Sequence, residues 1–389
     1  MNVPLLDLKI QYQSLKTELD NALIRVAESQ NFILGKEVED FENEISKSLS
    51  LKYSLGVSSG TDALLLALMA LDIKPGDEVI VPTFSFFATA GVVSRLNAIP
   101  VLVDSDPVTF NINPELIEKK ITSKTKAIIP VHLFGQSCEM DRIIQIAKKY
   151  NLKIIEDAAQ SISVQYKNGN PVGTIGDIGC YSFFPSKNLG CFGDGGLVTT
   201  NDENLFEKLK IMRVHGSKPK YYHKVIGGNF RIDAIQAAIL RVKLPHLNQW
   251  SQARRNNADL YDKLFIDNKL ATLTGKINFS ENEKVLLPKP IYKISTLTNY
   301  HIYNQYIIRA EKRDELRKFL SDNNISTEIY YPVPFHRQEC FKYLNYSDSD
   351  FPIANSSADN SIALPIYPEL KNEQINYVVE TIKKFFQNK

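Results

Sequence analysis

Short apolar runs alternate with segments of helical period between about residues 50 and 200. The runs that predict strands are residues 53–57, 78–84, 99–105, 126–133 and 152–159. Short buried strands that alternate with helices are typical of a parallel sheet with helices on its faces. The pattern therefore predicts an α/β fold with a mostly parallel sheet.

Residues 139–150 carry the helical period most clearly. Their apolar positions recur at i, i+3, i+4 and i+7, and they are Met140, Ile143, Ile144 and Ala147. Residues 180–184 and 196–200 predict two more strands, which form an antiparallel hairpin or widen the sheet. A further helix is expected over residues 233–244.

Beyond Trp250 the composition shifts toward charged residues and asparagine, and a helix over residues 254–265 is expected to lead out of the main domain. The elements expected after it are a strand at 300–310, a helix at 311–323, a strand at 325–331 and a helix at 371–387. We therefore expect a large domain over residues 1–250, including an N-terminal segment, and a small α/β domain over residues 251–389.

Composition narrows the class of protein. With 43% hydrophobic and 23% charged residues, the 389-residue chain resembles ordinary globular proteins. A net charge of +2 gives no electrostatic basis for general binding to nucleic acid. The longest apolar run, Ala63 to Leu71, is far shorter than the roughly 20 residues that cross a bilayer. The start of the chain does not read as a secretory signal, and four cysteines form no disulfide framework, so we expect a cytoplasmic protein without membrane partners.

The segment SSGTDALLLAL follows a predicted strand and opens a helix. The backbone N–H groups of Gly60 and Thr61 would therefore point at a guest beyond the helix N-terminus, and a phosphate suits that position. Gly60 would allow close approach of the backbone, and Thr61 could donate its hydroxyl. An ordinary helix cap by serine or threonine explains the same residues.

The strand LKIIEDAAQ ends in Glu156 and Asp157. Carboxylates at the carboxyl end of a parallel strand lie where open α/β sheets bind ligands. Burial raises the pKa of such an acid unless a cation, for example a protonated heterocycle, lies beside it. The alternative is an aspartate that caps the next loop.

Lys187 lies in the segment CYSFFPSKNLGCFGDGG, between aromatic residues and glycines. A lysine in a partly apolar pocket loses proton affinity, which frees its amine for Schiff-base chemistry. In PTFSFFATA, the rings of Phe84, Phe86 and Phe87 could stack on a flat ligand, although a plain core role is equally open. A solvated surface lysine is the alternative for Lys187.

Together these features describe a site for a phosphorylated aromatic aldehyde that contains nitrogen. The phosphate would bind at Gly60 and Thr61, the ring against an aromatic side chain, the ring nitrogen at Asp157 and the aldehyde at Lys187. The ligand that fits is pyridoxal 5'-phosphate (PLP), and no metal is implied.

The chain resembles the DegT/DnrJ/EryC1/StrS family of sugar aminotransferases, which are PLP enzymes of fold type I. The motifs SSGTDALLLAL, PTFSFFATAG, VHLFGQ, EDAAQ, SFFPSKNLGCFGDGG, GGNFRIDAIQ and LPIYP carry this resemblance, which runs from PLLDL to the last helix. It implies that Lys187 is the Schiff-base lysine and that Asp157 holds the pyridine nitrogen. The resemblance further implies cofactor contacts by Gln160 at the ring hydroxyl, Phe86 on the ring face, and Ser182 with Gly60 and Thr61 at the phosphate.

The same resemblance implies a homodimer with shared sites, in which Asn229 reaches a phosphate across the interface. It also implies contacts to the substrate, a nucleotide-linked sugar. The residues concerned are Tyr222, His223, Arg231, Tyr331 and His336. Surface or hinge roles are the alternatives for these five side chains.

Phe184 stands three residues before Lys187, where several relatives that act on 4-keto sugars have histidine. The pattern SFFPSK resembles the branch that aminates 3-keto nucleotide sugars, and Lys187 speaks against the sugar dehydratases, which have histidine in its place. The expected reaction moves an amino group from L-glutamate to a UDP- or dTDP-linked keto hexose, for lipopolysaccharide, surface polysaccharide or lipid A. The alternatives are a 4-keto sugar, a PLP-dependent elimination or desulfuration of an amino acid, and a regulatory protein that binds without turnover.

Overall fold

The computed structural model describes residues 1–272, 275, 278–279 and 283–387. Its largest feature is a seven-stranded sheet in the order β1-β7-β6-β5-β4-β2-β3. The strands are β1 (Tyr53–Val57), β2 (Glu78–Pro82), β3 (Ile99–Val103), β4 (Thr125–Ile128), β5 (Lys153–Asp157), β6 (Ile178–Ser182) and β7 (Gly196–Thr200). β7 runs antiparallel to both of its neighbours, and the other pairs are parallel. The expected α/β fold with a mostly parallel sheet is confirmed.

The two strands predicted near residues 180 and 196 were expected either to form an antiparallel hairpin or to widen the sheet, and they do both. β6 and β7 form an antiparallel pair, and they also widen the sheet, because β6 pairs with β5 and β7 pairs with β1. The predicted run 126–133 is too long, since β4 ends at Ile128, two residues before Pro130. A proline has no N–H to donate to a neighbouring strand, which favours an early end.

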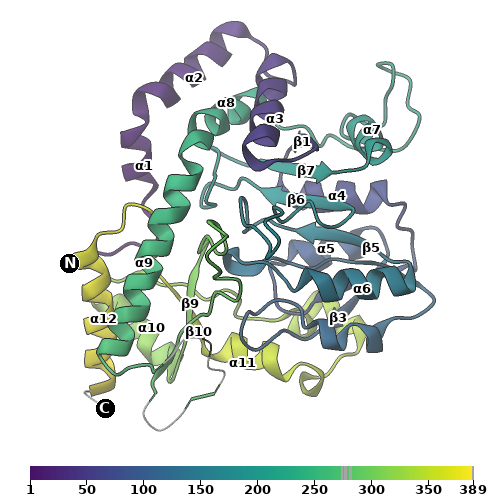
Figure 1. The fold of residues 1–389 in the computed structure, drawn as a ribbon. Coiled ribbons are helices and arrows are strands. Elements are labelled where there is room, and N and C mark those ends of the chain that lie inside the picture. The colour runs from purple at the N-terminus through teal and green to yellow at the C-terminus, as the bar shows by residue number, and fades with distance from the viewer. Residues whose placement is uncertain (273–274, 276–277, 280–282, 388–389) are drawn as a thin grey trace.

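The two faces of the sheet are covered by different helices. Consecutive residues of β2 alternate between the cores, because Val79 and Val81 join one apolar cluster and Ile80 joins the other. α4 (Gly60–Ala70) and α5 (Ala88–Arg95) cover the first face and α6 (Met140–Tyr150) covers the second (Figure 1). α7 (Glu203–Met212) packs against α4, and α8 (Ala234–Lys243) follows a long loop. The predicted helices at 139–150 and 233–244 are confirmed.

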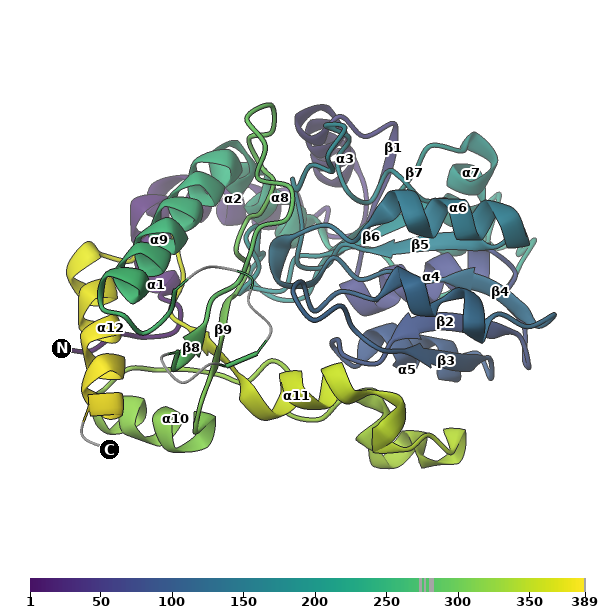
Figure 2. The ribbon, with the colours of Figure 1, turned by 60° about the horizontal axis from the view of Figure 1, so that its bottom comes forward.

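A second sheet of three strands has the order β10-β9-β8. Its strands are β8 (Val285–Leu286), β9 (Tyr306–Ala310) and β10 (Ser361–Leu364), and its helices are α10 (Arg313–Asp322) and α12 (Asn372–Gln387). The long helix α9 (Leu247–Asp267) leads to it from the large sheet and packs against α12 (Figure 2). The two sheets fall on either side of the expected boundary at residue 250.

The strand predicted at residues 325–331 is wrong. β10 takes the place next to β9, and this segment meets β10 through one bridge, between Glu328 and Ala363. The strand predicted at 300–310 is half right, since β9 begins at Tyr306 and the residues before it cross toward the large sheet. Apolar residues of both segments are buried, among them Ile302, Ile325 and Ile329, but burial of an apolar residue does not require that its segment pairs as a strand.

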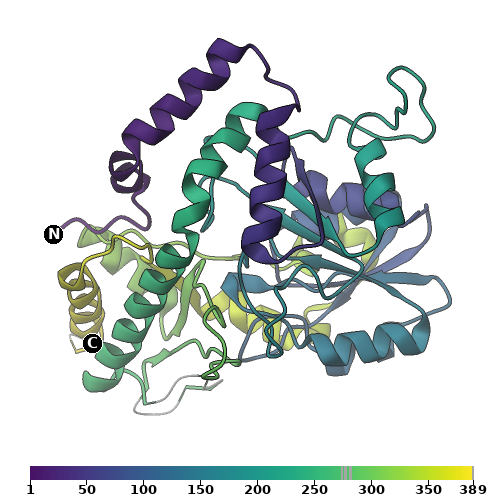
Figure 3. The same cartoon turned by 45° about the horizontal axis from the view of Figure 1, so that its top comes forward.

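Three helices precede the first strand, and they are α1 (Leu8–Ser14), α2 (Lys16–Ser29) and α3 (Lys36–Leu49). α2 and α3 both pack on α8, while Val3 forms a bridge with Ile325 near the small sheet (Figure 3). Residues 335–351 lie against the large sheet, where Phe335, Phe341 and Phe351 join the core, and α11 (Pro352–Asn360) leads from there back to β10 of the small sheet. Short 3-10 helices are Pro114–Leu116, Glu118–Lys120, Leu133–Gly135, Leu244–His246, Phe335–Arg337, Glu339–Leu344 and Asp348–Asp350. Among the described residues, no helix combines the length and the apolar character that a membrane span requires.

Candidate active site

Lys187 lies in the loop that follows β6. Its backbone N–H donates to the Phe184 carbonyl at 2.8 Å, which closes a turn. The side chain is partly buried, and burial lowers the pKa of its amine to about 8, with an opposing effect from the charge of Asp157. Within the described part of the chain, no hydrogen bond or ion pair holds this amine. Such an amine is available to bond a carbonyl carbon near neutral pH.

Asp157 is the last residue of β5 and is 4% exposed. Thr89 Oγ1 donates to Asp157 Oδ2 at 2.8 Å, and the Ala159 N–H donates to Oδ1 at 3.2 Å. Burial raises the pKa of the carboxyl, whereas the two hydrogen bonds and the charge of Lys187 favour the ionised form. Asp157 therefore caps the loop that follows it, through the hydrogen bond from the Ala159 N–H, and it also interacts electrostatically with Lys187.

Glu156 has a different environment from Asp157, because successive side chains of a strand point to opposite faces. It is fully buried. Its carboxylate accepts from the N–H groups of Gly173, Ile175 and Gly176 at 2.8, 2.6 and 2.6 Å, and lies 2.9 Å from His132 Nε2. Glu156 thus anchors the loop at residues 173–176, which leaves Asp157 as the carboxylate for a ligand.

Gly60 and Ser182 meet where α4 begins. A Cβ atom on Gly60 would lie 2.8 Å from Ser182 Cβ, so a side chain at this position would displace its neighbour. Ser59 caps the helix by accepting from the Asp62 N–H at 3.0 Å, so the capping interpretation is also realised. The N–H groups of Gly60 and Thr61 have no acceptor among the described residues, as is normal for the first turn of a helix. These groups fit a phosphate.

Phe86, Gln160 and Tyr331 come together although they are far apart in the sequence. Phe86 is 57% exposed, and its ring centroid lies 6.2 Å from that of Tyr331. Gln160 Nε2 donates to the Tyr331 hydroxyl at 3.0 Å, and Gln160 Oε1 accepts from the Phe134 N–H at 2.7 Å. An amide nitrogen carries two hydrogens, so Gln160 keeps one for a ligand oxygen. Their roles toward a cofactor or sugar stay predictions.

His336 links two parts of the protein. Its Nδ1 lies 2.9 Å from Thr83 Oγ1, just after β2, and its Nε2 lies 3.0 Å from Asn355 Oδ1 on α11. The ring is buried, and burial lowers its pKa. Both ring nitrogens already have protein partners, which supports the hinge role. The contact of His336 with a sugar stays a prediction.

Tyr222 and His223 lie on the exposed segment at residues 216–228, which projects beside α7 (Figure 1). His223 Nδ1 lies 2.8 Å from the His215 carbonyl, and the Lys218 N–H donates to the Tyr222 carbonyl at 2.9 Å. Neither side chain makes a hydrogen bond or ring contact with Lys187 or Asp157 in the part of the chain that the structure describes. Their predicted contact with substrate remains a prediction.

Asn229 and Arg231 directly follow this segment in the sequence, and this part of the chain passes close to the start of α4. Arg231 pairs with Val57 through a backbone bridge and lines a hollow of about 330 Å³. The other residues around that hollow are Ser58, Ser59, Asp62, Asp194, Asp233 and Gln236. Asn229 is exposed. Its predicted reach across a subunit interface is not tested by one chain.

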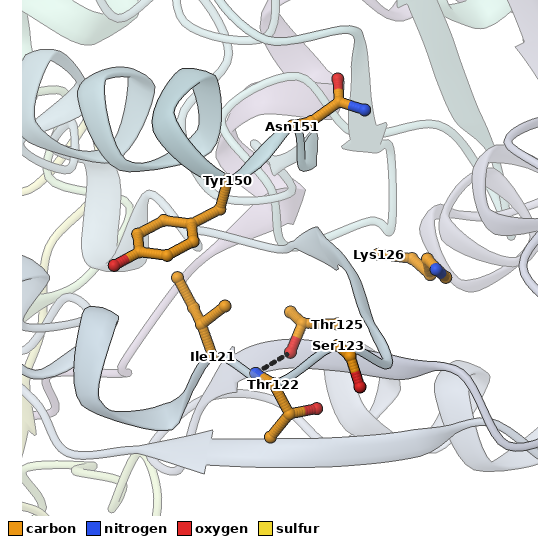
Figure 4. Close-up of a pocket in the computed structure, with 7 residues that line it drawn as sticks. All are labelled: Ile121, Thr122, Ser123, Thr125, Lys126, Tyr150 and Asn151. Carbon is orange, nitrogen blue, oxygen red and sulfur yellow. Dashed lines mark hydrogen bonds between the residues drawn. The ribbon is translucent and has the colours of Figure 1, made fainter.

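A larger hollow of about 540 Å³ lies elsewhere, at the amino ends of β4 and β5. Figure 4 shows its residues, among them Lys126, Tyr150 and Asn151, and the hydrogen bond from the Thr122 N–H to Thr125 Oγ1. Among the described residues, it is lined by Lys126 and by no carboxylate. The residues predicted to bind the cofactor lie instead at the carboxyl edge of the sheet, where parallel α/β sheets bind ligands.

Two residues with direct contacts to the site were not expected from the sequence. Thr89 donates to Asp157. Asn188, which directly follows Lys187, donates to the Ile302 carbonyl and accepts from the Asn304 amide. Thr89 stands in the segment PTFSFFATA, in which the aromatic residues are the more conspicuous feature. No local pattern marks a hydroxyl or an amide for a partner that lies far away in the sequence.

Curated relatives match the chain along its whole length. A "Pleiotropic regulatory protein" from Geobacillus stearothermophilus is 48% identical, and the match covers 100% of both chains. A "UDP-N-acetyl-3-dehydro-alpha-D-glucosamine 3-aminotranferase" from Acidithiobacillus ferrooxidans is 39% identical, over 98% of this chain and 97% of the relative.

Solved structures share the fold. DesV from S. venezuelae, crystallised "in complex with ketimine intermediate", has a TM-score of 0.90 at 38% identity, over 99% of this chain and 98% of the other. NtdA from Bacillus subtilis, "with bound cofactor pmp", has a TM-score of 0.85 at 30% identity, over 98% of this chain and 85% of the other. The fold type I assignment is therefore confirmed.

The family model described as "DegT/DnrJ/EryC1/StrS aminotransferase family" matches residues 13–383. The expected resemblance covers nearly the whole chain, and the residues at the carboxyl edge of the sheet fit the phosphate, ring and aldehyde of PLP. The chain belongs to the DegT/DnrJ/EryC1/StrS aminotransferase family, and it is a PLP-dependent aminotransferase.

Proposed function

We propose that this enzyme moves the amino group of L-glutamate to the keto group of a nucleotide-linked hexose. The observation that carries the proposal is the position of Lys187, whose amine has a pKa lowered to about 8, within electrostatic range of the buried carboxyl of Asp157. A nucleotide sugar is the proposed acceptor because a 39% identical relative is named for a UDP-linked 3-keto sugar.

Each residue of the site has a proposed task. PLP supplies an aldehyde that takes up the amino group and a ring that withdraws electrons from the carbon losing its proton. Lys187 Nζ removes the proton from Cα of the amino donor and delivers it to the cofactor carbon. Asp157 holds the ring nitrogen in its protonated form. Proton transfer by such a positioned group typically contributes about 10²–10⁴-fold in rate.

The remaining residues are proposed to bind and orient. Gly60, Thr61 and Ser182 hold the phosphate, Phe86 covers one face of the ring, and Gln160 donates to the ring hydroxyl. Tyr331 orients Gln160 through the hydrogen bond of 3.0 Å and borders the sugar. The proposed substrate contacts are Tyr222, His223, Arg231 and His336.

A 3-keto sugar linked to UDP or dTDP is the proposed substrate, and lipopolysaccharide, surface polysaccharide or lipid A is the proposed destination of the product. The proposal rests on Phe184 in the motif SFFPSK, because several relatives that act on 4-keto sugars have histidine at this position. Phe184 is 52% exposed beside the Lys187 turn, which supports contact with a substrate.

A homodimer with shared sites is also proposed, with the cytoplasm as its place of action. Exposed apolar side chains support it: Phe184 and Phe192 on the loop of Lys187 are 52% and 41% exposed, and Tyr221 and Ile226 on the projecting segment at residues 216–228 are 79% and 86% exposed. Mixing Lys187→Ala and Asn229→Ala protein tests this arrangement. Recovery of activity in the mixture is expected if Asn229 serves the partner's cofactor, and two inactive parents that stay inactive would contradict it.

The experiment for the whole proposal supplies PLP, L-glutamate and a panel of 3-keto and 4-keto nucleotide sugars. Formation of 2-oxoglutarate should depend on a keto sugar, and NMR of the product should locate the new amine at C3. An amine at C4 would favour the 4-keto alternative. A relative carries the name "Pleiotropic regulatory protein", and binding of sugar without any 2-oxoglutarate would favour a regulatory role.

A further inference from the structure

Thr89 connects helix α5 to the carboxylate at the end of β5. It is the second residue of α5 and is 0% exposed. Its Oγ1 donates to Asp157 Oδ2 at 2.8 Å and lies 3.2 Å from Ser85 Oγ. Residues 89 and 157 are 68 positions apart, so the contact depends on the fold and not on local geometry.

The direction of the hydrogen bonds follows from counting protons. A carboxylate accepts and a hydroxyl has a single proton. The proton of Thr89 goes to Asp157, so Ser85 donates to Thr89. The result is a chain of hydroxyl groups that runs from Ser85 through Thr89 and ends on Asp157. In such a chain the hydroxyl groups polarise one another, which strengthens the charge-assisted hydrogen bond from Thr89 to the Asp157 carboxylate.

Asp157 needs this support because burial raises the pKa of its carboxyl and so disfavours the charged form. Its two side-chain hydrogen bonds come from Thr89 and the Ala159 N–H. Titratable side chains of other elements also face it, and they are Lys187, His132, Cys138, Cys180 and Tyr331. None of these forms an ion pair with Asp157 within the described residues. Thr89 therefore makes the shorter of the two contacts that fix the orientation of the carboxylate.

We propose that Thr89 is a positioning residue, whose hydroxyl fixes the Asp157 carboxylate and keeps it ionised so that it can hold the protonated ring nitrogen of PLP. The inference rests on the proposed role of Asp157. Each carboxylate oxygen has two lone pairs, and Thr89 and the Ala159 N–H occupy two of the four. The other two stay open to the ring nitrogen.

Thr89→Val tests the proposal, since it removes the hydroxyl and keeps the branched shape. With 15N-labelled PLP, the ring-nitrogen signal should move toward that of the unprotonated ring. The dissociation constant of PLP should rise, and the half-reaction with L-glutamate should slow, each by about tenfold, as expected for one lost hydrogen bond to a charged group. Thr89→Ser should restore all three values.

The matched control is Thr381→Val on α12, another buried threonine whose hydroxyl donates, at 2.7 Å, to the Tyr377 carbonyl. It should leave the ring-nitrogen signal and PLP binding unchanged. If Thr89→Val does not fold, Thr89→Ala is measured instead, because it removes the same hydroxyl with less bulk next to β5.

A double-mutant cycle separates positioning from general damage. In the Asp157→Asn background, Thr89→Val should add little to the loss of rate, because the acceptor it serves has gone. Additive losses, or a ring-nitrogen signal in Thr89→Val identical to that of wild type, would overturn the proposal. If the wild-type protein failed to bind PLP, that result would instead contradict the proposed function of the site.

Discussion

The side chains of Asn188 and Asn304 are joined by a hydrogen bond of 2.7 Å, in which the Asn304 amide donates to the Asn188 oxygen. Asn188 donates in turn to the Ile302 carbonyl at 3.0 Å. Asn188 directly follows Lys187, and residues 302–304 lead into β9 of the small sheet. The loop of the candidate lysine is therefore tied to the segment that enters the small domain.

Asn188→Ala should lower the free energy of unfolding by about 1–3 kcal/mol, because it leaves a buried amide and a buried carbonyl without partners. Urea unfolding of the apo-protein measures this change. Asn376→Ala on α12 is the control, since that exposed side chain donates to the Asn372 carbonyl one helical turn away. Equal stability of the two variants would show that the link at Asn188 contributes nothing.

The capture of PLP by the apo-protein should depend on the protonation of Lys187. Only the neutral amine attacks an aldehyde, and the pKa of this amine is lowered to about 8, so the rate should rise as the pH passes through about 8. Stopped-flow absorbance at fixed PLP measures the rate. A midpoint near 10.5, the ordinary value for lysine, would contradict the burial of this amine.

Asp157→Asn should move that midpoint to lower pH. The carboxylate favours the charged amine, so its removal makes the lysine easier to deprotonate. Lys243 provides the control, because burial also lowers its pKa to about 8, while its amine donates to the Gly190 carbonyl at 2.7 Å. Lys243→Gln should leave the midpoint where it is in wild type.

Substitutions of Glu156 and Asp157 should have different effects, the first on stability and the second on catalysis. Glu156→Gln places an amide where three N–H donors converge, so we expect unfolding to become easier by about 3 kcal/mol. Asp157→Asn should keep the fold and slow the half-reaction with L-glutamate by about 100-fold. Thermal unfolding and single-turnover absorbance measure the two effects, and an exchange of the two outcomes would reverse the assigned roles.

Gly60→Ala should weaken the binding of PLP more than that of pyridoxal, which has no phosphate. The added Cβ would lie 2.8 Å from Ser182 Cβ and must displace a residue of the proposed phosphate site. We expect the dissociation constant of PLP to rise by about tenfold, the cost of one weakened charged hydrogen bond. Equal losses for both ligands, measured by fluorescence titration, would argue against a phosphate at this helix N-terminus.

The apolar pattern predicted the large sheet well because its strands are short, buried and separated by clear helices. β1 and β7 were placed at their true bounds, residues 53–57 and 196–200. No helix was predicted before residue 50, although Val38, Phe41 and Ile45 of α3 are buried at helical spacing. The strand predicted at residues 325–331 failed because residues 361–364 take the place next to β9, and an apolar run does not reveal which segment pairs at a given sheet edge.

The residues of the candidate site likewise fall into those that the sequence could predict and those that it could not. Lys187, Asp157 and Gly60 stand in local motifs, so sequence could place them at loop, strand end and helix start. The contacts of Tyr331 with Gln160 and of Thr89 with Asp157 join residues 171 and 68 positions apart. Such pairs depend on how the layers pack, which no local pattern encodes.

Reduction of the PLP-loaded enzyme with borohydride, followed by peptide mass spectrometry, tests the central claim most directly, because reduction makes the bond between lysine and cofactor permanent. The phosphopyridoxyl mass should be found on Lys187. Its presence on Lys243 or another lysine, or its absence from every peptide, would contradict the assignment of this site.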